Sequence, residues 1–300
     1  MRLFCFSCLL FLLFACTKEI NIELPKQEPK IVVNSLFTNK EPFQVYLTKT
    51  RTPFETKEFF IDNAKVIIYS GNIADTLQYT GDGIYTSSVL GLANSEYRIE
   101  VISDGFDKVT SKDYIPKQIE QPMISGFRDS VGVDEEGYYY SQFTIAFKDD
   151  ASERNFYEIS IKDLVFGDET WVKPCFSNDP IIVAEGLNDY YPKTIVFSDA
   201  FFNGKEKELA INYYPVAYGK PSGGSGELVD ANYKVIVRFK NISENYYKYK
   251  KKLEVHLSGQ DFDFWEGSGD PVQMFSNITD GYGIFAGYTE IVDTIQKLKK

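Results

Sequence analysis

Histidine is nearly absent from this sequence, and its scarcity excludes several kinds of catalytic site. His256 is the only histidine among 300 residues. A triad that depends on histidine, or a zinc site with several histidine ligands, needs more than this one side chain can supply. His256 also falls in a segment with a helical pattern, beside Leu257, which favours a packed or surface role. No catalytic constellation is found elsewhere, so we expect a protein that is not an enzyme.

Cysteines that could form a disulfide are missing as well. Cys5, Cys8 and Cys16 all lie at the N-terminus, in or next to a segment that we expect to be removed, and Cys175 stands alone. The mature chain then has no intrachain disulfide, so a sizeable hydrophobic core must stabilise it. No histidine lies near Cys175 in the sequence, which favours a structural thiol over a nucleophile.

The sequence also lacks an apolar run long enough to span a membrane. The longest such run, 3–15, has 13 residues, whereas a spanning helix needs roughly 20. It has the features of a signal peptide, so residues 1–15 are predicted to be cleaved. Leu13–Cys16 resembles a bacterial lipobox, which makes Cys16 the acylated N-terminus. A signal peptide with an incidental cysteine, or a short buried helix, is the alternative. The polar residues 16–30 are predicted to be a tether.

Positive charge is in deficit, and the net charge is −11. Such a balance repels polyanions, so we expect no binding to DNA or RNA. Phenylalanine and tyrosine are abundant, at 24 and 21 residues. This enrichment is typical of half-buried β-sheets.

Alternating apolar residues and glycine-containing turns predict a mainly β fold with two sandwich-like domains. Residues 31–116 read as an Ig-like β-sandwich of roughly seven strands, and residues 123–300 as a larger β-rich domain. The proline-bounded stretch between them, 116–122, is a predicted linker. The second domain is expected to contain one amphipathic helix, over 243–258.

The predicted helix has a start signal, an apolar face and a basic face. Ser243 is a suitable N-cap, and apolar residues from Tyr246 to Leu257 recur at three- and four-residue steps. Lys248, Lys251 and Lys252 lie on the opposite face. A solvated face is the simpler interpretation, and contact with lipid headgroups or an acidic partner is the alternative.

The glycine-rich stretch DGYGIFAGY, residues 280–288, superficially resembles a phosphate-binding loop. Its spacing is G-x-G-x-x-x-G, and a strand-like segment follows it, so the dinucleotide fingerprint does not fit. We therefore predict no cofactor and expect a tight turn into a core strand. Glycine at these positions would permit a positive φ or a close backbone approach.

Asp261, Asp263 and Asp270 in the stretch 259–271 are weak candidates for calcium ligands, because carboxylates are hard oxygen donors. Their spacing is not that of an EF-hand. The alternative is an ordinary loop held to the core by its aromatic residues, so no metal is predicted. A catalytic pair of carboxylates also stays open, since 43 acidic residues offer many pairs and none stands out.

Several segments together resemble a known family. They are CTKEINIELPKQEPKIVVNSLF, FSDAFFNGKEKELAINYY, NISENYYKYKKKLE and FSNITDGYGIFAGYTE, in this order from Cys16 to about Tyr288. The chain is similar to the domain of unknown function 4249 family of Bacteroidota lipoproteins. Its most specific part is Asn277-Ile278 followed by Gly281, Gly283, Phe285 and Gly287. The resemblance implies an outer-membrane lipid anchor and association with TonB-dependent transporters. It supplies no catalytic residues.

Three functional hypotheses follow. The first is an accessory lipoprotein that binds the substrate or the barrel of a TonB-dependent transporter. The others are a structural or assembly component of the cell envelope and a surface hydrolase, which the missing motif disfavours. Thr17 stands where aspartate often marks inner-membrane retention, which favours the outer membrane. Lys18-Glu19 partly matches a surface-export signal, so we expect the anchored protein to face the cell exterior.

Overall fold

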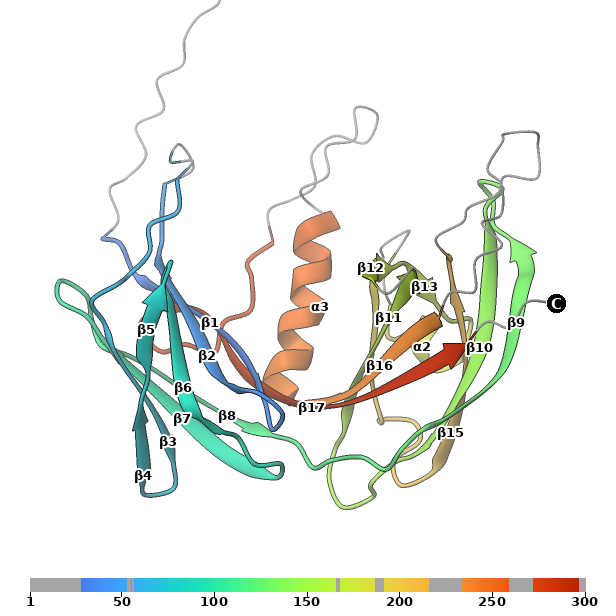
Figure 1. Cartoon of the computed structure of the whole chain (residues 1–300), viewed down its shortest axis with the longest axis horizontal. Coiled ribbons are helices and arrows are strands. Elements are labelled where there is room, and N and C mark those ends of the chain that lie inside the picture. The colour runs from blue at the N-terminus through green and yellow to red at the C-terminus, as the bar shows by residue number, and fades with distance from the viewer. Residues whose placement is uncertain are drawn as a thin grey trace, which may run out of the picture.

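The computed structural model describes residues 28–52, 55, 57–165, 168–186, 192–215, 234–258 and 272–296. Strands make up 56% of the structure and helices 9%, which confirms the mainly β fold class. The strands form two lobes, and the helix α3 (Glu244–Ser258) stands between them (Figure 1). None of the helices within the described ranges has the length and apolar character that crossing a bilayer requires.

The first lobe, called the N-lobe, contains the strands that precede Pro116. They are β1 (Ile31–Thr38), β2 (Pro42–Lys49), β3 (Lys65–Ser70), β4 (Ile73–Thr76), β5 (Gln78–Gly81), β6 (Ile84–Leu90), β7 (Ser95–Ile102) and β8 (Val109–Ile115). One sheet has the order β4-β3-β7-β8, and β1, β2, β6 and β5 belong to a larger sheet. Alternate residues of both sheets, such as Val33, Leu47 and Ile99, share one core. The N-lobe is therefore a two-layer sandwich.

The second lobe, called the C-lobe, is also a two-layer sandwich. Its strands are β9 (Met123–Val133), β10 (Tyr139–Lys148), β11 (Phe156–Val165), β12 (Asp168–Lys173), β13 (Cys175–Phe176), β14 (Thr194–Ser198), β15 (Glu206–Tyr213) and β16 (Lys234–Ile242). The sheet β13-β15-β10-β9 packs against β11, β14 and β16 of the larger sheet. Phe143 and Ile211 meet Tyr157 and Phe239 in the core between these layers.

The last strand, β17 (Tyr282–Gln296), belongs to both lobes. Residues 282–288 pair in parallel with β1, and residues 288–296 pair antiparallel with β16. The larger sheet thus runs without interruption in the order β12-β11-β16-β17-β1-β2-β6-β5, with β14 also paired to β11. Figure 1 shows β17 crossing from one lobe to the other beneath α3. Backbone hydrogen bonds, in addition to the linker, therefore join the lobes.

Glycines allow β17 to lie this close to its neighbours. Gly283 has φ +108°, and a Cβ at this position would lie 2.0 Å from the carbonyl oxygen of Val33. A Cβ on Gly287 would lie 2.1 Å from the carbonyl oxygen of Tyr114. Both distances are far shorter than a non-bonded contact between carbon and oxygen, so only glycine fits. The close backbone approach expected for the DGYGIFAGY stretch is confirmed.

Helix α3 covers the face of the larger sheet that lies opposite the two sandwich cores. The backbone N–H of Tyr246 donates to Ser243 Oγ at 3.2 Å, which confirms Ser243 as the cap. Tyr246 is buried against Ile242 and Ile284. The predicted apolar face is shorter than expected, because Leu257 is 53% exposed.

Buried ion pairs also fasten α3 to the sheet. The carboxylate of Glu158 on β11 lies 2.9 Å from Lys240 Nζ and 3.2 Å from Lys250 Nζ of the helix. Burial alone would raise the pKa of Glu158, but the two ammonium groups outweigh it and lower this pKa. Glu158 is therefore a buried carboxylate that stays ionised.

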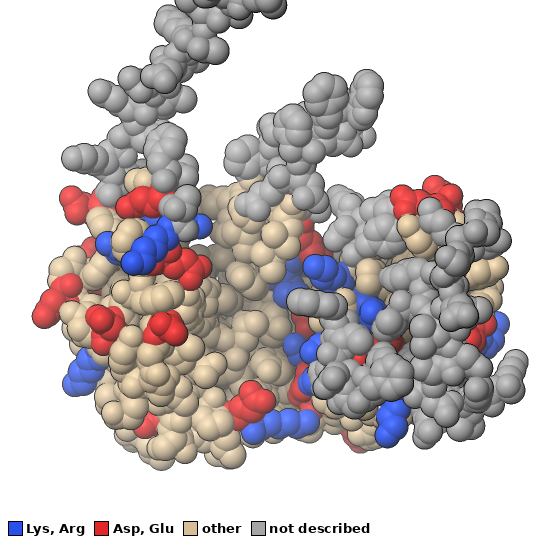
Figure 2. Space-filling model, turned by 45° about the horizontal axis from the view of Figure 1, so that its top comes forward, with Lys and Arg blue, Asp and Glu red and all other residues tan. Residues whose placement is uncertain are grey.

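The basic face of α3 is only partly solvated, which corrects the sequence interpretation. Lys251 Nζ lies 3.6 Å from the carboxylate of Glu185, and Tyr247 donates to the same carboxylate at 2.7 Å. Lys248 instead makes an exposed pair with Glu244. Figure 2 shows basic side chains gathered between α3 and the C-lobe. Glu185 is distant in sequence, so helix periodicity alone could not reveal this contact.

A second, short helix, α2 (Pro180–Ala184), was not expected from the sequence. Asp179 caps it by accepting a hydrogen bond from the N–H of Ile181 at 2.9 Å, and Pro180 occupies its first turn. This combination is a recognised start signal, but the segment is too short to show helical periodicity. Its C-cap residue is Glu185, whose carboxylate contacts Tyr247 and Lys251 of α3.

Candidate functional site

The site residues predicted from the sequence lie outside the described part of the chain. Cys16 and the tether fall within residues 1–27, and Asp261, Asp263 and Asp270 fall within residues 259–271. Within the described ranges, no group of three or more histidine, cysteine, aspartate or glutamate side chains is placed to hold a metal ion. The candidate site described below comes from residues that the sequence did not single out.

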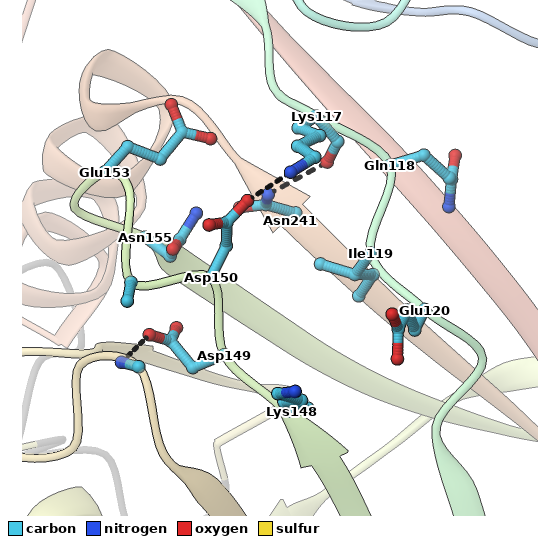
Figure 3. Close-up of a pocket in the computed structure, with 12 residues that line it drawn as sticks. Lys117, Gln118, Ile119, Glu120, Lys148, Asp149, Asp150, Glu153, Asn155 and Asn241 are labelled. Carbon is cyan, nitrogen blue, oxygen red and sulfur yellow. Dashed lines mark hydrogen bonds and ion pairs between the residues drawn. The ribbon is translucent and has the colours of Figure 1, made fainter.

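A cavity of about 280 Å³ lies where the linker passes from the N-lobe to the C-lobe (Figure 3). Three parts of the chain form most of its wall: the linker residues 117–120, the turn 148–155 after β10, and Asn241 near the end of β16. Gly204, from the loop before β15, completes the wall. The cavity therefore lies between the linker and the C-lobe, on the face of β16 opposite α3.

The linker is held in place by Lys117, the residue after Pro116. The carbonyl oxygen of Lys117 accepts hydrogen bonds from Asn241 Nδ2 at 3.1 Å and from Thr289 Oγ1 at 3.3 Å. Its ammonium group forms a 2.5 Å ion pair with Asp150 (Figure 3). Pro116 and Pro122 bound the segment and keep it out of regular structure. The linker side of the cavity is thus held to β16, to β17 and to the turn after β10.

Two neighbouring aspartates shape the opposite wall. Asp149 is buried and accepts hydrogen bonds from the hydroxyl of Tyr157 and, at 2.6 Å, from the N–H of Gly204. Asp150 accepts from Ser152 as well as from Lys117. All four carboxylate oxygens therefore already have donors. These bonds give the two aspartates a structural role.

Two buried amide oxygens in the wall have no donor. They are Asn155 Oδ1 and Asn241 Oδ1, on residues that are 2% and 1% exposed. Leaving a buried oxygen unpaired costs about 1–3 kcal/mol. Turning the Asn241 amide over would not help, because its Nδ2 already donates to Lys117. Each oxygen has less than 1 Å² of accessible surface, so neither is open to the cavity.

Asp150 is not suited to be a proton donor. The hydrogen bond and ion pair with Lys117 hold the pKa of Asp150 far below its usual range, so Asp150 has no proton to donate near neutral pH. A general acid requires the opposite shift. The residues that line the cavity include no nucleophile with an adjacent base.

The two other residues considered for chemistry lie away from the cavity lining. His256 is on α3, where its Nδ1 lies 3.0 Å from the carbonyl oxygen of Val272. Cys175 is fully buried, and burial raises the pKa of its thiol to about 12. A thiol with this pKa is not ionised at neutral pH, which makes it unreactive. Cys175 packs in the core of the C-lobe.

Comparisons with solved structures add little to this geometry. A chain of "Cytokine receptor complex - Crystal form 1A" is 10% identical, with 72% of this chain and 86% of that chain covered and a TM-score of 0.26. The major pilin subunit BcpA of Bacillus cereus is 12% identical, with coverages of 72% and 65% and a TM-score of 0.21. Neither likeness is close enough to support a functional comparison.

Family membership is clearer. No curated protein matches the chain. The family model described as Domain of unknown function (DUF4249), in contrast, matches residues 17–292. The match includes the linker, the cavity lining, α3 and the glycines of β17. The chain therefore belongs to the DUF4249 family.

Proposed function

We propose that this protein is a lipid-anchored outer-membrane protein that acts outside the cell as a non-enzymatic binding component of a TonB-dependent transport system. The observation that carries the proposal is the lipobox-like sequence ending at Cys16, placed ahead of a folded body whose first strand begins at Ile31. The resemblance noted in the sequence, to a family of outer-membrane lipoproteins that associate with TonB-dependent transporters, implies the same assignment.

The geometry of the folded body agrees with an anchored module. Figure 1 shows the start of β1 at one end of the N-lobe, and the linker passing beneath β17 at the other end. The segment from Cys16 to Lys30 spans at most roughly 50 Å when extended. A tether of this reach would let the folded body lie over a neighbouring barrel without itself contacting lipid.

The chemistry of the described residues supports binding rather than catalysis. The cavity's aspartates are engaged in structural bonds, the thiol of Cys175 is buried, and His256 lies elsewhere. Because one sheet runs through both lobes, the position of one lobe relative to the other is fixed. Such a body is suited to docking on a neighbouring barrel or to capturing a ligand.

The anchor is tested by mass spectrometry of the N-terminus of the mature protein. The proposal predicts a chain that begins at Cys16 and carries acyl groups. A Cys16→Ala variant should leave the membrane fraction or stay uncleaved, because acyl chains supply the membrane affinity. Cys8→Ala, in the segment expected to be removed, is the matched control and should be acylated normally. An unmodified N-terminus at any other residue would refute the anchor.

Location is tested separately, by treating intact cells with a protease. Digestion of the wild-type protein, while a periplasmic marker survives, is the expected result. Protection of the protein in intact cells would assign it to the periplasmic leaflet and contradict the exterior location.

A further inference from the structure

Two exposed aromatic rings lie where the chain enters the first strand of the N-lobe. Val32 of β1 is paired with Tyr282 of β17 on one side and with Thr48 of β2 on the other. Phe60 continues this row, because it forms a β-bridge with Thr48. Paired residues point to the same face of a sheet, so the rings of Tyr282 and Phe60 share one surface. Their exposed fractions are 46% and 43%.

We call this end of the N-lobe, with Lys30, Lys49, Phe59, Phe60 and Tyr282, the entry end. Lys30 immediately precedes β1, and Lys49 is the last residue of β2. Lys49 Nζ lies 4.5 Å from the centre of the Phe59 ring. The rings and the long stems of the lysines offer apolar surface, while the ammonium groups can stay in water.

The charges at the entry end are of both signs. Figure 2 shows red and blue side chains side by side on this part of the N-lobe, at the upper left of the view. The basic residues include Lys30, Lys49 and Arg51, and the acidic residues include Glu55, Glu58 and Asp82. Opposite charges this close together leave little net field, so a partner at the entry end must be held through the rings.

The proposed anchor attaches this end of the folded body, and not another, to lipid. The segment from Cys16 to Lys30 stops directly before β1 and spans at most roughly 50 Å. Groups joined to a surface by so short a chain meet it at a high effective concentration, so a weak contact is enough to hold them there. The same reach permits contact with lipid and separation from it. The surface chemistry at the entry end therefore decides between the two.

From these features we propose that the entry end rests on the lipid surface, with the rings of Phe60 and Tyr282 at the level of the headgroups. A tyrosine ring suits this level because its body is apolar and its hydroxyl is polar. Phe60 adds apolar area beside it. The proposal rests on the acyl anchor proposed above and goes beyond it, because an anchor by itself requires no contact between the folded body and lipid.

Brominated lipid tests the contact, because bromine quenches tryptophan fluorescence only at close range. The acylated mature protein is reconstituted on phosphatidylcholine vesicles whose acyl chains either carry bromine or do not. Phe60→Trp should lose roughly half of the fluorescence of its added tryptophan, because a ring at an interface lies about 5–10 Å deep. Tyr282→Trp is a second reporter and should respond in the same way. The signal of the two native tryptophans, measured on the wild type, is subtracted.

Leu92→Trp is the matched control at the other end of the N-lobe. Leu92 is 67% exposed, so its environment is even more open than that of Phe60. It follows β6, which runs antiparallel to β2, as β2 does to β1, so it lies far from Ile31. Its tryptophan should keep its fluorescence on brominated vesicles. Raising the salt concentration should change none of these results, because the contact does not depend on net charge.

Two fluorescence results would overturn the proposal: no quenching of either reporter at the entry end, or equal quenching of Leu92→Trp. Flotation of the same samples with the vesicles measures the anchor separately. Protein that floats without quenching keeps its anchor, and only the lipid contact is refuted. Protein that does not float refutes the anchor and the lipid contact with it. If quenching is absent and Phe60→Ser loses a co-purifying barrel, the entry end binds that barrel instead of lipid.

Discussion

Asp113 on β8 accepts a 2.5 Å hydrogen bond from the hydroxyl of Ser243, the N-cap of α3, across 130 positions of sequence. The same carboxylate lies 3.4 Å from the N–H of Gly287 on β17. Asp113 is 7% exposed. One buried carboxylate thus ties the N-lobe, the central helix and the shared strand together.

Because Asp113 is buried, the free energy of unfolding of the protein depends on pH. Burial raises the pKa of Asp113 to about 6, although the hydrogen bond from Ser243 partly opposes the change. A folded-state pKa above the unfolded value means that the native protein binds more protons. The contribution of Asp113 to the free energy of unfolding is therefore fully present below about pH 4. It is lost as the pH rises through about 6.

We predict that Asp113→Asn removes this dependence. The free energy of unfolding of the wild type, relative to the variant, should fall by roughly 3 kcal/mol between about pH 4 and pH 7. Urea denaturation of both proteins at each pH measures the difference and cancels the other titrating groups. Asp104→Asn, in the exposed turn after β7, is the control. Parallel pH profiles for wild type and Asp113→Asn would contradict the assignment.

The joint formed by β17 is tested at Gly283. Gly283→Ala adds a Cβ that meets the carbonyl oxygen of Val33, whereas the same change at Gly105, also at positive φ (+81°), meets open space. Both variants place a Cβ at a positive φ, so the clash with Val33 is the main difference between them. Gly283→Ala should cost about 1–3 kcal/mol more than Gly105→Ala in denaturant unfolding. Equal losses would mean that the strands at this joint lie further apart.

The attachment of α3 is tested at Glu158. Glu158→Gln leaves Lys240 and Lys250 buried without their counter-charge, and we expect a loss of roughly 3–5 kcal/mol in the free energy of unfolding. Lys248→Met removes only the exposed pair with Glu244 and should cost under about 0.5 kcal/mol. An equally small loss of stability in both variants would mean that Glu158 does not hold the helix to the sheet.

Local signals in the sequence were enough to predict much of the fold. Alternation predicted the strands, and Ser243 followed by an apolar periodicity predicted α3, because both depend on residues near one another in the chain. The double role of β17 could not be predicted this way. It depends on Gly283 and Gly287 approaching Val33 and Tyr114, and no local pattern records which distant backbone a glycine will meet.

The candidate site escaped sequence reasoning for a related reason. Its residues come from the linker, from the turn after β10 and from β16, and they match no motif. Two weak signals were present: the prolines that bound the linker, and the pair Asp149-Asp150 directly after a strand. The unpaired oxygen of Asn241 becomes visible only when its neighbours are known.

Affinity purification from native membranes tests the central functional claim most directly. The acylated protein, tagged at its C-terminus and extracted in a gentle detergent, should recover a TonB-dependent barrel in near-equal amount. Cys16→Ala should lose most of that barrel, because the anchor keeps the two proteins side by side. Recovery of the acylated protein with envelope-assembly components and without any TonB-dependent barrel would contradict the proposed transport role.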